Sequence, residues 1–174
     1  GKTGLHKNSL SSRTEDVPMK KILKAETPSE RRNRSRDLVA KLVAERTEMF
    51  TIFCRLAGVD AYSSEAHSPR SNKATQKLLQ EFCQILVDYI AAGHFALYER
   101  IADGTERRGN VLTLAEKHYA RIAETAESAL AFNDKYDCGD HCEALTDLHQ
   151  DLDKLGKELA ERIELEDKLI NAFG

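Results

Sequence analysis

The stretch from Leu78 to Ile101 constrains the fold most, because its apolar residues recur at the spacing of a long helix. When each residue takes a helical step of about 100°, these residues form one stripe that is expected to face a core. The stripe contains Leu79, Phe82, Leu86, Ile90, Gly93, Leu97 and Ile101. The opposite side contains Glu81, Asp88, Ala92, Phe95 and Glu99, and His94 and Tyr98 lie between the two sides. A phenylalanine among carboxylates on an outward side is typical of a protein-docking surface.

A second amphipathic segment precedes this stretch. It begins at Thr27-Pro28-Ser29-Glu30, where proline suits the first helical position and threonine can cap the helix. Gly58 is expected to end it. Several arginines near its start oppose the helix dipole, which favours a frayed start or a later start near Ser35. These arginines are Arg31, Arg32, Arg34 and Arg36.

The remaining helix boundaries follow from capping residues. The stretch from Leu78 is expected to be capped by Ser71 or Asn72 and to end at Asp103-Gly104. A third helix is expected from Asn110 to about Asn133, with Val111, Ala115, Tyr119, Ile122, Ala126, Ala129 and Leu130 on its apolar side. The fourth carries leucines and isoleucines from Leu145 to Ile170 at nearly heptad spacing. The pattern predicts an all-α protein, an up-down-up-down four-helix bundle over residues 28–174 with a disordered tail over residues 1–27.

Composition narrows the classes of function. The chain has 174 residues, enough for one domain with a sizeable core. Its net charge of −3 argues against nucleic-acid binding through bulk electrostatics. Because no apolar run approaches the roughly 18 residues of a membrane span, we expect a cytoplasmic protein without membrane attachment. Its cysteines, Cys54, Cys83, Cys138 and Cys142, are then expected to be reduced.

The chain contains residue types that suit a zinc site, a phosphotransfer histidine or a carboxylate metal centre, but each set also has a simpler interpretation. Cys138, His141 and Cys142, with His149 further on, are zinc-ligand types, but their spacing matches no standard zinc motif and favours an ordinary loop. His94 in a bundle is compatible with phosphotransfer, although a carboxylate and bulky rings follow it. Glu164, Glu166 and Asp167 have no histidine partner at helical spacing, so we interpret them as a solvated face. We therefore expect no metal, no cofactor and no enzymatic activity.

One long motif resembles a known family. The segment Phe82-Cys83-Gln84-x-Leu86-Val87-Asp88-Tyr89-x-x-Ala92-Gly93-His94-Phe95-x-x-Tyr98-Glu99 is similar to the central motif of the Rsd/AlgQ family, the regulators of sigma D. A C-terminal match is Ala160-x-Arg162-x-x-Leu165-Glu166-Asp167-Lys168-Leu169-Ile170. Ala131-Phe132-Asn133-Asp134 resembles the AlgQ branch.

The resemblance implies a bacterial helical-bundle anti-sigma factor. Such a protein binds region 4 of the primary sigma factor, a basic helix-turn-helix domain, and limits its use by RNA polymerase in stationary phase. Its partner is then a protein, with no direct DNA binding, and the chain is expected to be a monomer or weak dimer. An alternative is a signalling bundle that interacts with a phosphocarrier or phosphotransfer partner through His94.

The resemblance also implies which residues meet the sigma factor: Asp88, His94, Phe95, Tyr98 and Glu99, with Tyr89 in support. On the outward side, Asp88 is expected to pair with an arginine of region 4, Phe95 to anchor the contact and Ala92 to leave room. The family's first-helix motif, Leu-[Val/Ile]-Asp-Arg-Trp, corresponds to Leu38-Val39-Ala40-Lys41-Leu42, so only its basic position remains, as Lys41. Whether His94 is a contact, a pH-sensitive group or a packed core residue stays open.

Overall fold

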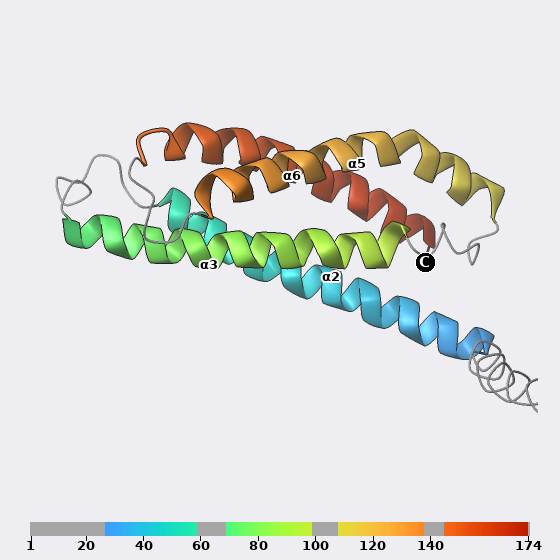
Figure 1. Ribbon diagram of the computed structural model, residues 1–174. Helices are drawn as coiled ribbons and strands as arrows, with labels where there is room; N and C mark the ends of the chain where they lie inside the picture. Colours follow the sequence, from blue (N-terminus) through green and yellow to red (C-terminus); the bar gives the residue numbers. More distant parts are fainter. Residues whose placement is uncertain (1–26, 59–68, 99–107, 138–144, 174) are drawn as a thin grey trace, which may run out of the picture. The chain divides into compact units, whose positions relative to one another are not determined.

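The computed structural model of the chain describes residues 27–58, 69–98, 108–137 and 145–173 (Figure 1). These residues form helices and include no strand. In chain order they are α2 (Pro28–Ala57), α3 (Pro69–Gly93), the π-helix η2 (His94–Tyr98), α5 (Gly109–Tyr136) and α6 (Leu148–Phe173). The prediction of an all-α protein is therefore confirmed.

The chain divides into two compact units, residues 1–36 and residues 37–174. In the first unit, the described residues open α2 with a reciprocal cap. The Glu30 backbone N–H donates to Thr27 Oγ1 at 3.1 Å, and the Thr27 N–H donates to Glu30 Oε2 at 2.9 Å. This capping box satisfies donors that a helix start leaves free. The predicted start at Pro28 is correct, and the alternative start near Ser35 is wrong.

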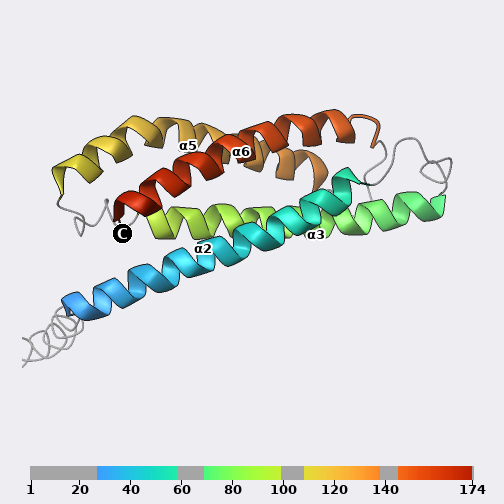
Figure 2. The same cartoon turned by 180° about the vertical axis from the view of Figure 1, so that it is seen from behind.

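The second unit is the helical bundle. α3 runs antiparallel to residues 37–57 of α2, α5 runs antiparallel to α3, and α6 runs antiparallel to α5 (Figure 1 and Figure 2). This is the order that the up-down-up-down prediction requires. α5 packs along both α6 and α3. Within the described residues, no helix is long and apolar enough to cross a membrane.

Aromatic side chains connect three of these helices through the core. The Phe53 ring of α2 lies 5.9 Å from the Phe82 ring of α3, which lies 5.6 Å from the Phe132 ring of α5. Apolar residues from every helix of the unit surround them, among them Leu42, Met49, Leu86, Ile122 and Leu159, all fully buried. Their burial supplies the main favourable term in folding.

Several predicted boundaries were wrong by a few residues. α3 begins at Pro69 rather than after Ser71 or Asn72, because proline fits a first turn that needs no N–H. α5 begins at Gly109, and its N-cap residue is Arg108 rather than Asn110. It continues to Tyr136, beyond the predicted end near Asn133. The predicted end of the second helix at residues 103–104 lies outside the described residues.

Candidate functional site

The candidate docking surface lies where α3 passes into η2. Asp88, His94 and Phe95 are all exposed there, as the helical spacing predicted for Asp88 and Phe95. Phe95 is 47% exposed, an unusual position for a phenylalanine that has a core nearby. One turn before Asp88, the Gln84 amide donates to Asp88 Oδ1 at 3.3 Å, which orients the carboxylate. An apolar ring and an oriented carboxylate therefore face solvent two helical turns apart.

η2 differs from the regular helix that the sequence predicted. Its hydrogen bonds span five residues instead of four, so each residue turns less about the axis than in an α-helix. Ala96 and Leu97 remain buried, and His94 and Phe95 point outward. π-helical turns are rare and frequently occur at functional sites.

A stack of three rings connects η2 to α5. His94 stacks on Tyr98 with centroids 5.4 Å apart, and Tyr98 stacks on Tyr119 of α5 at 4.3 Å. Two hydrogen bonds cross between the same segments: the Tyr119 hydroxyl donates to the Leu97 carbonyl at 2.8 Å, and the Tyr98 hydroxyl donates to the Tyr119 carbonyl at 3.2 Å. Burial raises the pKa of both phenols, so both hydroxyls keep the proton that they donate.

The structure corrects one predicted surface residue and leaves another undescribed. Ala92, expected on the outward side, is buried with 5% exposure. α3 has neighbours on more than one side, so its buried arc is wider than the single stripe assumed from the sequence. Glu99 lies outside the described residues. Tyr89 is fully buried, consistent with a supporting role.

The first-helix residues fall into two groups. Lys41 and its neighbour Ala40 are exposed on α2. Leu42 is fully buried and lies beside Gly93 of α3. Leu42, where the expected family motif has tryptophan, therefore belongs to the core, whereas Ala40 and Lys41 are on the surface.

A buried ionic network behind α3 was missed from the sequence. Arg162 and Glu166 of α6 are 1% and 0% exposed, and Arg162 Nε donates to Glu166 Oε2 at 2.9 Å. Glu166 Oε1 accepts from the Tyr89 hydroxyl at 2.5 Å and from Arg46 Nη2 at 3.1 Å. The interpretation of Glu166 as part of a solvated acidic face was wrong. The available signal was the heptad register, because positions 162 and 166 continue the stripe formed by Leu155, Leu159 and Leu169.

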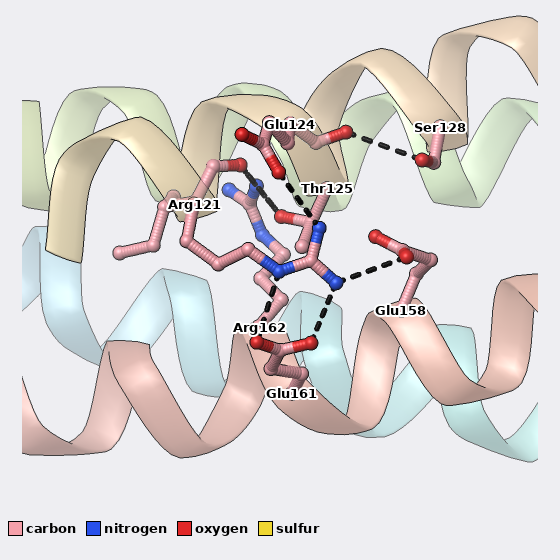
Figure 3. Close-up of polar contacts among 8 residues, drawn as sticks. Arg121, Glu124, Thr125, Ser128, Glu158, Glu161 and Arg162 are labelled. Carbon is pink, nitrogen blue, oxygen red and sulfur yellow. Dashed lines mark hydrogen bonds and ion pairs between the residues drawn. The ribbon is translucent and has the colours of Figure 1, made fainter.

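This network fills the space beside Gly93. Arg162 Nη1 donates to the Ile122 carbonyl and to Thr125 Oγ1, each at 3.2 Å, so its guanidinium is held in place from α5 (Figure 3). A Cβ atom at position 93 would lie 2.7 Å from Arg162 Nη2, inside van der Waals contact. Position 93 therefore has no room for a side chain while the Arg162 guanidinium stays where it is.

A second arginine lies nearby but at the surface. Figure 3 shows Arg121 of α5 between the carboxylates of Glu124, Glu158 and Glu161, with Nη2 to Glu161 Oε2 at 2.5 Å. These contacts tie α5 to α6 on an exposed face. They involve none of the candidate docking residues.

The end of α5 and the beginning of α6 line an open pocket of about 520 Å³ beside a polar link. Asp151 of α6 accepts from Lys135 Nζ at 2.6 Å and from the Tyr136 hydroxyl, both on α5. The Lys135 ammonium, and then the Tyr136 hydroxyl, hold the pKa of Asp151 below its usual range. This link joins the two helices on either side of residues 138–144.

The residues considered as zinc ligands lie mostly outside the described residues. Cys138, His141 and Cys142 lie outside the described residues, and His149 is exposed on α6. Among the residues that the structure describes, no three histidine, cysteine or acidic side chains are grouped as metal ligands. Cys54 and Cys83 are free thiols.

Comparisons with known proteins agree with the sequence motif. A family model described as "Regulator of RNA polymerase sigma(70) subunit, Rsd/AlgQ" matches residues 21–173. A "Regulator of sigma D" from Yersinia enterocolitica is 31% identical over 150 residues, covering 83% of this chain and 85% of the relative. Another from Salmonella arizonae is 34% identical over 152 residues, covering 83% of this chain and 86% of the relative. No solved structure matches the chain.

Proposed function

Because the chain belongs to the Rsd/AlgQ family of regulators of the RNA polymerase sigma(70) subunit, we propose that it binds a sigma factor and regulates the use of that factor by RNA polymerase. The match extends over nearly the whole bundle, so the proposal concerns the folded unit. No chemical step is required of such a protein, since occupying a surface of the sigma factor is sufficient.

More specifically, we propose that it binds region 4 of the primary sigma factor through the outer surface of α3 and η2. The observation that carries this proposal is the exposed Phe95 ring beyond the oriented carboxylate of Asp88. An aromatic side chain that enters a partner's pocket is a common energetic centre of an interface. The carboxylate is suited to an arginine of a basic helix-turn-helix domain.

The two residues are expected to contribute differently. Phe95 contributes desolvated apolar contact, so its loss should raise the dissociation rate. Asp88 is exposed, so its pairing should speed association and discriminate against wrong partners more than it adds affinity. Its contribution should therefore weaken at high salt. Lys41 on α2 and His94 on η2 are proposed at the rim of the same surface.

The test is a binding titration with isolated region 4 of the host's primary sigma factor. Phe95→Ala should weaken binding by about 30-fold, the size of a typical hot-spot residue. Asp88→Arg should abolish binding by charge reversal, and neither change touches the core. Leu130→Ala and Asp134→Arg are matched controls, because Leu130 is 44% exposed and Asp134 is exposed, both on α5. Binding by Phe95→Ala and Asp88→Arg that equals wild-type binding would exclude this surface.

A second candidate rests on the exposure of His94. An accessible imidazole can accept a phosphoryl group from a phosphocarrier partner. Its immediate neighbours, however, are the rings of Phe95 and Tyr98, at 5.7 Å and 5.4 Å. Phosphorylation at His94 by a phosphocarrier protein, lost in His94→Gln while region 4 binding persists, would support this candidate. Its absence would leave binding as the function.

A further inference from the structure

We propose that Tyr98 and Tyr119 form a clamp that holds η2 in its π-helical form and thereby positions Phe95 and His94 for docking. Tyr119 is a new assignment, since it lies on α5 and outside the exposed surface. The inference rests on the proposed function for its binding arm, and on the structure alone for its conformational arm.

The geometry of the turn explains why a clamp is needed. In a continuing α-helix, Tyr98 would lie about 100° around from Leu97, on the flank between the core side and the outer side. The smaller turn per residue in η2 keeps Tyr98 half-buried, against Tyr119. Phe95 lies on the outer side in either form, and in η2 it stays away from buried Ala96 and Leu97. The π form therefore turns Tyr98 inward while Phe95 stays outward.

The hydrogen bonds fit this role. The Tyr119 hydroxyl donates to one carbonyl inside η2, that of Leu97, at 2.8 Å. The Tyr98 hydroxyl returns a bond to the Tyr119 carbonyl on α5. Because each tyrosine bonds to the other's segment, neither segment can rotate without breaking a bond.

The ionic network fixes the other end of η2. Gly93 directly precedes the π-helix, and Arg162 and Glu166 lie within 2.7 Å and 3.3 Å of where its Cβ would be. α3 is thus held against α6 at Gly93, and η2 is held against α5 at Leu97 and Tyr98. His94 and Phe95 lie between these two fixed points, with His94 stacked on Tyr98. A rigid aromatic pair at an interface loses little conformational entropy on binding.

The experiment compares Tyr119→Phe with Tyr136→Phe. Each change removes one hydrogen-bonded tyrosine hydroxyl from α5 and keeps its ring, and the hydroxyl of Tyr136 bonds Asp151 rather than η2. The first readout needs no partner: NMR shifts of the His94 ring protons and hydrogen exchange of the η2 amides. Both should change in Tyr119→Phe and stay at wild-type values in Tyr136→Phe.

The second readout is affinity for isolated region 4, measured well below the unfolding temperature. Tyr119→Phe should weaken binding about fivefold, the effect of one neutral hydrogen bond, and Tyr136→Phe should not. In the background of Phe95→Ala, Tyr119→Phe should have a smaller effect than in the wild type, because Tyr119 acts mainly through Phe95. A merely structural tyrosine would lower stability without this coupling.

The outcomes separate the two proposals. Unchanged His94 shifts and η2 exchange in Tyr119→Phe would overturn the clamp. Changed shifts with wild-type affinity would overturn its role in docking. Failure of the wild-type chain to bind region 4 would overturn the proposed function instead, and the NMR readout would still decide whether the clamp exists.

Discussion

At the scale of single residues, the two arginines in Figure 3 show how environment decides the value of an ion pair. Arg121 contacts three carboxylates but remains 32% exposed, so water and salt screen it. Arg162 makes fewer ionic contacts but is 1% exposed. Removing a buried partner leaves an uncompensated charge, which costs far more than losing a screened pair.

Arg162→Leu should therefore destabilise the protein by about 3 kcal/mol, near the lower end for a broken buried pair, because Arg46 and Tyr89 still contact Glu166. Arg121→Leu should leave the urea midpoint nearly unchanged. Urea unfolding followed by circular dichroism measures both free energies of unfolding. Equal losses in the two variants would contradict the assignment of Arg162 to the core network.

At the scale of elements, the sequence predicted helix types well and their junctions poorly. Apolar spacing identified Leu79, Phe82 and Leu86 as a buried stripe, and all three are fully buried. The π-helical turn could not be inferred, because it depends on Arg162 and Tyr119, which come from other helices. Leu130, predicted on the apolar side of α5, is exposed. The helical step alone does not tell how wide an arc neighbouring helices cover.

The link between the ends of α5 and α6 predicts an acid sensitivity. The pKa of Asp151 is lowered in the folded state by Lys135 and Tyr136, so the unfolded chain, with a carboxyl pKa of about 3.9, binds more protons near that pH. The stability from this carboxylate is present above that value and is lost as the pH falls through the folded pKa. Asp151→Asn should flatten this acid limb in urea midpoints measured from about pH 6 to about pH 2. An equally steep limb in the variant would exclude the link as its origin.

At the scale of the whole molecule, the sequence predicted features that depend on one helix and missed features that depend on contacts between helices. The antiparallel bundle follows from four local patterns and short connections, and it was predicted correctly. The exposure of Asp88 and Phe95 was also predictable, since it needs only one helix. Burial of Ala92 was not predicted, because the helical step of one helix does not tell how wide an arc its neighbours cover. Burial of Glu166 was signalled by the heptad register, but its partners Arg46 and Tyr89 come from other helices.

The bundle as a whole should protect one cysteine. Cys83 is 1% exposed, and burial, with the charge of Asp137 adding to it, raises its pKa to about 12. Cys54 is exposed. Because thiolates are the reactive form, iodoacetamide at about pH 8 should modify Cys54 readily and Cys83 only after unfolding. Peptide mass spectrometry along a urea series measures this, and similar rates at both thiols in the native protein would show that the core opens locally around Cys83.

The short approach between Gly93 and Arg162 also has an evolutionary consequence. A side chain at position 93 requires either a smaller residue at position 162 or a shift of the Arg162 guanidinium. The two positions are therefore expected to covary among homologues, although they lie on different helices. Lineages that keep both residues inherit the same π-turn and the same orientation of the aromatic pair after it. Divergence in partner choice would then arise at exposed positions such as Ala40 and Lys41, where no buried group restricts substitution.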